Sequence, residues 1–296
     1  MSHEPLRAQT TIALVTVLFN CDRHLPLFFE SLAVQTDRDF VVIVIDNASR
    51  DGSLARARML AGIHGLRCEF IANVGNLGIA VGNNQGIEWA RGMNVRHIVL
   101  INNDISCGPD LIEAIRRYAI DGSHRAWTCL AYSGNTKIRW YGGGRLSYWR
   151  ARGRHYGQRK STSIASPTPV TYAPTCLMYL HASVFDSVGL MDPQYFVYYD
   201  DTDFCRRLND AGILLQYDPR VTFNHYVGGS SGGEFSDFSI RLSTRNKFIY
   251  INKHYAGAAR WLVTVLAVVS KLVQLVSRKR RSATWLGLRE AWHLFR

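Results

Sequence analysis

The sequence lacks the short motifs that identify the common nucleotide-binding and zinc-binding folds. It has no Gly-x-x-x-x-Gly-Lys-Ser/Thr segment, and the first predicted strand-to-helix turn, residues 20–23, contains no glycine. The six cysteines are scattered, without a Cys-x-x-Cys pair or a His/Cys cluster of zinc spacing. These absences argue against a P-loop protein, a dinucleotide-binding domain and a zinc-organised domain. Scattered thiols fit a reduced protein of the cytoplasm.

Long hydrophobic runs are scarce as well. Residues 1–10 are polar and lack the apolar core of a secretory signal, and the apolar run that begins at Trp261 is interrupted by Lys271 and ends by Ser277. A membrane-spanning helix needs about 20 predominantly apolar residues. We therefore expect a cytoplasmic protein.

Acidic residues are in short supply and unevenly placed. The chain has 35 Lys+Arg against 23 Asp+Glu, a net charge of +12. No acid occurs from Gly122 to Phe185, and from Lys253 to the end the single acid is Glu290. A basic surplus of this kind predicts acidic partners such as nucleic acid, anionic lipid or phosphorylated substrates.

Two apolar segments that read as buried strands end in carboxylates. Residues 98–101 lead into Asn102, Asn103 and Asp104, and residues 40–45 lead into Asp46. Ligands of open α/β sheets bind at the carboxyl ends of the strands, where an Asp can bind a cation that holds a phosphate. Either acid alone could begin a turn or cap a helix. Their recurrence favours a nucleotide site.

Strand-like and helix-like segments alternate through the first part of the chain. We expect strands at 11–19, 40–45, 67–72 and 98–102, with helices at 25–35, 54–63, 78–90 and 109–120. This alternation predicts an α/β fold with a mostly parallel sheet. Residues 126–179 are rich in aromatics and glycines, which predicts short antiparallel strands and an acceptor-side mixed β region.

A pair of acids and a histidine in the second half are candidates for chemistry. Asp200 and Asp201 follow four aromatic or aliphatic residues, and a partly desolvated pair raises the pKa of one member toward that of a general base. We expect Asp203 only to stabilise the start of the helix. His225 ends a predicted strand before the glycine-rich residues 228–233, a place that suits a metal ligand gated by a loop or a structural histidine.

By the order and spacing of these motifs, residues 11–255 resemble the family-two glycosyltransferases of the GT-A fold, and among them the rhamnosyltransferase-like branch. The resemblance implies that Asp46 binds the nucleobase, that 102–104 stand at the Asp-x-Asp metal motif, and that Asp201 is the base of the pair. It also implies His225 as a metal ligand. Asn102 departs from the acid at its motif position, so Asp104 carries most of the metal-binding charge.

The resemblance further implies an inverting enzyme that uses Mg or Mn to move a sugar from a nucleotide sugar to a lipid-linked or polysaccharide acceptor. It favours dTDP-rhamnose as donor, with UDP-hexoses next. We add four residues near the strand ends to the expected nucleotide-binding set: Asn20, Asn73, Gly78 and Asn103. The implied catalytic domain covers 1–255, with a nucleotide half at about 11–121, an acceptor half at about 122–255 and a helical extension at 256–296.

The C-terminal extension reads as a basic amphipathic helix. Trp261, Val265, Val269 and Leu272 share one face, Lys271 belongs to the polar positions, and a cluster of basic residues at 278–281 follows. Such a helix lies in an anionic membrane interface, which would place the protein peripherally on the inner face of the cell membrane. The alternative is packing against the catalytic domain or against a second copy of the chain in a homo-oligomer.

Two other functions compete with the glycosyltransferase. A sugar-phosphate nucleotidyltransferase would use a similar sheet, but it commonly has a glycine-rich loop after the first strand, which residues 20–23 do not supply. A basic nucleic-acid-binding protein would present interleaved positive and aromatic residues, as residues 148–156 partly do. A nucleic-acid-binding function does not explain the acids at the strand ends, so we expect no nucleic-acid partner.

Overall fold

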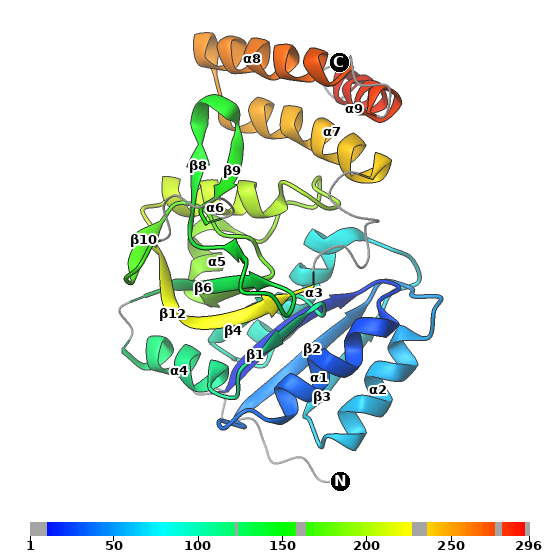
Figure 1. Cartoon of the computed structure of the whole chain (residues 1–296), viewed down its shortest axis with the longest axis vertical. Helices are drawn as coiled ribbons and strands as arrows, with labels where there is room; N and C mark the ends of the chain where they lie inside the picture. Colours follow the sequence, from blue (N-terminus) through cyan, green and yellow to red (C-terminus); the bar gives the residue numbers. More distant parts are fainter. Residues whose placement is uncertain (1–10, 122–123, 158–163, 227–235, 276–279, 294–296) are drawn as a thin grey trace.

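A computed structural model describes residues 11–121, 124–157, 164–226, 236–275 and 280–293 (Figure 1). Its main element is a 10-stranded sheet in the order β10-β12-β6-β11-β4-β1-β2-β3, with β5 beside β12 and β7 beside β6. The strands of this sheet are β1 (Ile12–Leu18), β2 (Phe40–Asp46), β3 (Cys68–Ala72), β4 (His97–Ile101), β5 (Ile105–Cys107), β6 (Ala126–Ser133), β7 (Arg139–Tyr141), β10 (Thr168–Val170), β11 (Leu177–His181) and β12 (Leu215–His225).

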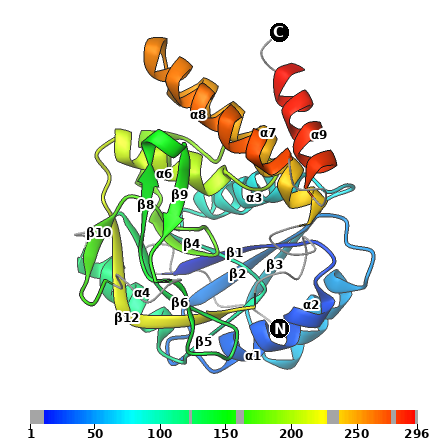
Figure 2. The same cartoon turned by 45° about the horizontal axis from the view of Figure 1, so that its top comes forward.

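The N-terminal half has the predicted parallel arrangement. Strands β4, β1, β2 and β3 pair in parallel, and the chain between them forms η1 (Asp22–His24), α1 (Leu25–Ala33), α2 (Ser53–Ile63) and α3 (Gly78–Gly92). α1 and α2 lie on one face of the sheet and α3 on the other (Figure 2). Because both faces are covered, all seven residues of β2 are buried, which explains its unbroken apolar sequence.

Helix α3 lies unusually close to the sheet. A Cβ at Gly86 would be 2.3 Å from Val15, and one at Gly82 would be 2.8 Å from Val17, both on β1. Glycines at these two helical positions therefore allow the close approach.

The second half is the mixed β region that the sequence predicted, and the strands paired within residues 126–179 are antiparallel. β11 pairs antiparallel with both β4 and β6, but β6 runs parallel to β12. The remaining elements of this half are α4 (Leu111–Asp121), a separate hairpin of β8 (Gly144–Ser147) and β9 (Arg152–His155), η2 (Tyr148–Arg150), α5 (Ser183–Val188) and α6 (Asp200–Asp210). The hairpin rises from the sheet toward the C-terminal helices (Figure 1).

Three helices complete the chain: α7 (Asp237–His254), α8 (Gly257–Leu275) and α9 (Arg281–His293). They share a small core with Tyr195, in which Tyr250, Val263 and Ala291 are buried. Helix α8 packs through Val263, Ala267 and Lys271, so the structure buries a lysine that the sequence pattern placed on the polar face. None of the helices in the described ranges is sufficiently long and apolar to span a bilayer.

Candidate active site

The acids at the two strand ends lie at one edge of the sheet. Asp46 is the last residue of β2, Asp104 follows β4, and β1 lies between these strands. Asn103, one residue before Asp104, donates a 2.7 Å hydrogen bond from Nδ2 to the carbonyl of Val17 on β1. The amide of Asn103 thus fastens the turn that presents Asp104.

Asp104 faces His225. The pairing of β12 with β5 sets His225 opposite Ile105, and His225 Nε2 lies 3.1 Å from Asp104 Oδ1. Burial raises the pKa of Asp104, but the hydrogen bond and charge of His225, with the charge of His24 on η1, outweigh burial and hold that pKa below its usual range. Asp104 is therefore a carboxylate, and His24 is a neighbour that the sequence did not point to.

The residues at this pair fit a divalent cation bound jointly with phosphate. Magnesium is commonly held by one or two carboxylates together with substrate phosphates and water, rather than by a complete protein cage. In the described ranges no three His, Cys, Asp or Glu side chains form a metal-binding group, so Asp104 and His225 stand as a pair. Asn102 hydrogen-bonds to Asp104, which makes it a support of the carboxylate in this structure.

Polar side chains line the ends of β1, β2 and β3. Asp46 accepts a hydrogen bond at Oδ2 from the backbone of Ser49, while its buried Oδ1 has no partner among the described residues. Asn73 binds both Asn47 and Gln85 through its amide. Oδ1 of Asp46 is therefore a buried acceptor that none of the described residues satisfies.

Asn20 and Gly78 shape the turns around this site. Asn20, with φ +49°, accepts a hydrogen bond at Oδ1 from the backbone of Arg50. Gly78 has φ +84°, and a Cβ there would be 2.4 Å from the carbonyl of Phe196. The next residue, Ile79, donates a 2.7 Å backbone hydrogen bond to that same carbonyl. The loop after β3 therefore contacts the segment that leads to Asp200.

The acid pair begins α6 after a strained turn. Tyr198 and Tyr199 both have left-handed backbones, with φ of +68° and +67°, which costs energy for residues other than glycine. Asn246 on α7 is fully buried and donates hydrogen bonds of 2.9 Å and 2.8 Å to the carbonyls of Val197 and Tyr198. Asn246 holds the turn that aims the pair, and no sequence motif indicated it.

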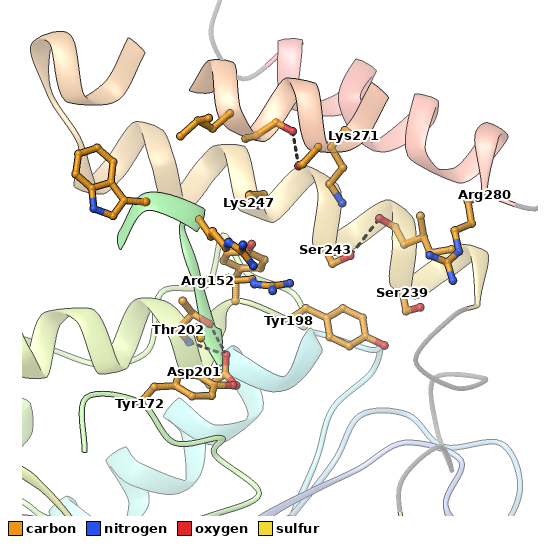
Figure 3. Close-up of a pocket in the computed structure, with 18 residues that line it drawn as sticks. Arg152, Tyr172, Tyr198, Asp201, Thr202, Ser239, Ser243, Lys247, Lys271 and Arg280 are labelled. Atoms are coloured by element: carbon orange, nitrogen blue, oxygen red, sulfur yellow. Dashed lines mark hydrogen bonds between the residues drawn. The ribbon is translucent and has the colours of Figure 1, made fainter. Parts of the chain in front are cut away.

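Within the pair, Asp201 is the member with hydrogen-bond donors. Tyr172 donates to Oδ2 at 2.6 Å, and Thr202 donates its backbone N–H to Oδ1, also at 2.6 Å (Figure 3). Burial raises the pKa of Asp201, although these hydrogen bonds oppose the rise. Burial and the charge of Asp201 raise the pKa of Asp200 well above its usual range. The donors therefore favour Asp201 as the charged member.

Asp201 and the Asp104–His225 pair surround one region. Burial raises the pKa of the Cys176 thiol, and the charges of both Asp104 and Asp201 add to the rise, so both carboxylates lie near this thiol. A row of rings also joins them: Tyr172 stacks on His155, His155 contacts Trp140, and Trp140 meets His225 edge-on with centroids 4.3 Å apart. The aromatic segment around residue 140 therefore forms one wall of the site. Tyr172, His155 and Trp140 were not identified from the sequence.

Asp203 does more than stabilise the start of its helix. Its side chain is fully buried and pairs with Arg207 at 2.9 Å, Lys253 at 2.8 Å and His254 at 2.7 Å. Burial raises its pKa, but these partners outweigh burial and lower the pKa to about 2. The expectation of a local role was wrong because two of the partners come from α7. The glycine-rich residues 228–233, expected to gate His225, lie outside the described residues.

Comparison with known proteins gives the family. Residues 13–187 match the model of glycosyl transferase family 2. An N-acetylglucosaminyl-diphospho-decaprenol L-rhamnosyltransferase of Mycobacterium tuberculosis is 26% identical over 95% of this chain and 99% of its own length. The dTDP-rhamnosyl transferase RfbF of Shigella flexneri is 23% identical over 80% of this chain and 78% of its own.

Solved structures share the fold at low sequence identity. The mannosyltransferase PcManGT of Pyrobaculum calidifontis, in complex with GDP-Man and Mn2+, aligns with a TM-score of 0.59 and 14% identity over 96% of this chain and 87% of its own. S. aureus TarS 1–349 aligns with a TM-score of 0.58 and 10% identity over 84% of this chain and 68% of its own. The family selects one of the three functions that the sequence left open: the chain belongs to glycosyl transferase family 2 and is a glycosyltransferase of the GT-A fold, similar to rhamnosyltransferases.

Proposed function

We propose that this glycosyltransferase transfers rhamnose from dTDP-rhamnose to a hydroxyl of a lipid-linked acceptor, with inversion at the anomeric carbon. One observation carries the proposal: a buried carboxylate held by Tyr172 lies across the same region as the Asp104–His225 pair. An inverting transfer needs a base for the acceptor hydroxyl and a charge that stabilises the leaving diphosphate. Asp201 lies on one side of this region, in the position of the base, and the Asp104–His225 pair lies on the side that would stabilise the diphosphate.

Asp201 acts as the base in this mechanism. The acceptor oxygen attacks the anomeric carbon as its proton passes to a carboxylate oxygen of Asp201, and the bond from that carbon to the nucleoside diphosphate breaks with its electrons on the departing phosphate. Tyr172 and Thr202 fix the carboxylate while leaving it lone pairs for the proton. Asp200, whose pKa is raised further, stays protonated beside it.

The donor lies along the ends of β1, β2 and β4 in this proposal. Oδ1 of Asp46, which has no partner among the described residues, accepts a hydrogen bond from the nucleobase. Thymine offers a ring N–H for that bond. Asn20, Asn73, Gly78 and Asn103 form the turns around the nucleotide. Asp104 and His225 would hold a divalent Mg or Mn ion, and Asn102 supports Asp104. When bound, that ion supplies positive charge to the leaving diphosphate.

We infer the identities of the donor and the acceptor from two related proteins. One acts on an N-acetylglucosaminyl-diphospho-decaprenol and another is a dTDP-rhamnosyl transferase. Incubation with dTDP-rhamnose, Mn2+ and an N-acetylglucosaminyl-diphospho-polyprenol should give a rhamnosylated lipid by mass spectrometry, with the inverted anomer by NMR. Transfer from UDP-GlcNAc or GDP-mannose but not from dTDP-rhamnose would refute the donor, and a retained anomer would refute the role of Asp201.

We also propose that the protein works at the cytoplasmic face of a membrane. Trp261 is 70% exposed, Trp285 and Trp292 are each 62% exposed, and Arg260 and Arg289 line the same groove between α7, α8 and α9. Tryptophans beside arginines suit an anionic lipid interface. Flotation with vesicles containing anionic lipid should carry the protein, and Trp261→Ser with Val269→Ser should weaken the binding. Equal flotation of this variant would contradict the proposal.

A further inference from the structure

A pocket of about 810 Å³ separates Asp201 from helix α8. Asp201 and Tyr172 lie at one end, while Arg152 comes from β9, Lys247 from α7 and Lys271 from α8 (Figure 3). The residues assigned to the donor, such as Asp46, Asp104 and His225, do not line it. The pocket therefore lies on the acceptor side of the proposed base.

The lining of this pocket is strongly basic. Asp201 is the single acid among its described lining residues, and its hydrogen-bond donors are Tyr172 and Thr202. The cationic side chains that line it are Arg150, Arg152, Lys247, Lys271 and Arg280. More than ninety residues separate Arg152 from Lys247, so the fold, and not one basic stretch of sequence, brings these charges together.

Keeping these cations together costs stability. Lys271 is only 8% exposed, and burial with the charge of Arg152 lowers its pKa to about 8. Burial, with the charges of Lys271, Arg152 and Arg150, likewise lowers the pKa of Lys247 to about 8. A buried cation is costly unless an anion compensates it.

The protein compensates other cations nearby. Lys253, six residues after Lys247 on α7, pairs with both Asp192 and Asp203. Across the described part of the chain, neither Lys247 nor Arg152 forms an ion pair with a carboxylate. Positive charge that no carboxylate of the protein neutralises is typical of a site whose counter-ion is a bound ligand.

We propose that this pocket binds the phosphate groups of an acceptor whose sugar is carried on a diphosphate, with Lys247 and Lys271 as the principal contacts and Arg152 as a third. The inference rests on the proposed function, because it takes Asp201 as the base that receives the acceptor hydroxyl. When the acceptor hydroxyl lies at Asp201, the diphosphate carried by the same sugar lies one sugar ring away from that carboxylate. The hydroxyls of Ser239 and Ser243 line the same pocket.

The far side of α8 suits the lipid end of such an acceptor. The helix presents Ala267 and Lys271 to the pocket and leaves Trp261, Val269 and Leu272 70%, 53% and 53% exposed. One helix thus joins a phosphate-binding wall to an apolar outer surface. An acceptor with both a diphosphate and a lipid chain meets both faces.

The test compares Lys247→Gln and Lys271→Gln with Arg117→Gln, a loss of the same charge at a 65% exposed position of α4, outside the pocket and the C-terminal helices. Inorganic pyrophosphate, added without donor or metal, should bind the wild-type protein in calorimetry. Each lysine variant should raise the Kd for pyrophosphate roughly 10- to 100-fold, the loss of a charged hydrogen bond, and Arg117→Gln should leave it unchanged. The melting temperature of Lys247→Gln should not fall, because the substitution removes a buried charge that Lys271 and Arg152 repel.

Acceptor kinetics distinguish the acceptor diphosphate from other phosphates. The lysine variants should raise KM for an N-acetylglucosaminyl-diphospho-polyprenol roughly 10- to 100-fold and leave kcat/KM for octyl N-acetylglucosaminide, which has no phosphate, unchanged. Equal effects on both acceptors, or lost binding of the nucleoside diphosphate, would overturn the inference. If the wild type transfers to neither acceptor, the proposed function fails, and pyrophosphate binding at Lys247 and Lys271 still decides whether the pocket is an anion site.

Discussion

The phenol of Tyr172 donates a 2.6 Å hydrogen bond to Oδ2 of Asp201. This bond joins the aromatic wall of the site to the acid pair at the start of α6, because the ring of Tyr172 also stacks on His155. Burial raises the pKa of Asp201, and this hydrogen bond is the largest effect that opposes the rise. Tyr172 therefore favours the charged form of Asp201, the residue proposed as the base.

Tyr172→Phe should move the acidic limb of the rate profile to higher pH. The hydrogen bond favours the charged carboxylate, so its removal raises the pKa of Asp201, and deprotonation then requires a higher pH. The measurement is kcat against pH for the wild type and the variant with dTDP-rhamnose. Tyr141→Phe, which removes a hydroxyl bonded to the backbone of Tyr172, is the matched control and should leave the limb in place. If the acidic limb does not shift in Tyr172→Phe, Asp201 is not the group whose ionisation controls the rate.

Asp104→Ala should abolish the metal-dependent part of nucleoside diphosphate binding. Asp104 is the carboxylate facing His225, and a ligand at about 100 times its Kd adds about 2.7 kcal/mol to the stability of the folded state. Thermal unfolding with dTDP, with and without Mn2+, measures that gain. Asp186→Ala, at an exposed position, is the control. An undiminished Mn2+-dependent shift in Asp104→Ala would exclude Asp104 from the metal site.

Asp203→Asn should lower the free energy of unfolding by about 3–5 kcal/mol near neutral pH, because three cationic or ionisable partners lose a buried counter-charge. The folded pKa of about 2 lies below the usual pKa of about 3.9 for an unperturbed aspartate. This stabilisation is therefore complete above about pH 4 and is lost as the pH falls toward 2.

Urea unfolding at pH 7 and pH 3 tests both parts of this prediction. The difference between wild type and Asp203→Asn should narrow at pH 3. Asp210→Asn, which breaks a pair with Arg206 on the same helix where Asp210 is 51% exposed, should cost no more than about 1 kcal/mol. A difference that stays constant with pH would show that Asp203 is not the titrating group.

Asn246→Ala should impair catalysis more than donor binding. Without the amide, the carbonyls of Val197 and Tyr198 lose their donor, and the left-handed turn before Asp200 relaxes. Lost stability should be about 1–3 kcal/mol, kcat should fall, and the Kd for dTDP should stay within about twofold. Asn252→Ala, on the same helix but bonded to the exposed Arg260, is the control. Equal losses in kcat for both variants would contradict the positioning role.

The sequence predicted the sheet edge because its signals are local. The apolar runs of β2 and β4 are continuous because these strands are buried on both faces. β2 ends in Asp46 and β4 is followed by Asp104, and the fold places both acids at the carboxyl edge. The alternation of these strands with helices was sufficient to predict parallel pairing of β4, β1, β2 and β3. The position of His225 beside Asp104 depended on the pairing of β12 with β5, which periodicity does not reveal.

Contacts between distant helices could not be predicted in this way. Asp203 looked like a helix-start residue because its partners Lys253 and His254 are about fifty positions away. Lys271 looked like a solvent residue because it falls among the polar positions of α8, away from the wide apolar face that the sequence assigned to a membrane or a protein surface. The structure packs the narrower row of Val263, Ala267 and Lys271 instead. Helical periodicity gives the faces of a helix but does not say which face meets the protein.

Asp201→Asn should leave donor and metal binding nearly unchanged and reduce transfer about 10²–10⁴-fold, since the amide keeps the size of the side chain but cannot accept the proton. Asp200→Asn should be milder, because the raised pKa of Asp200 keeps it protonated and the amide resembles a protonated carboxyl. Initial rates and dTDP titrations of the two variants decide which aspartate is the base, because the two positions are adjacent and the two substitutions are equally conservative. A fully active Asp201→Asn would overturn the mechanism. Loss of activity in Asp200→Asn instead would assign the base to Asp200, with Tyr172 and Thr202 then holding its neighbour.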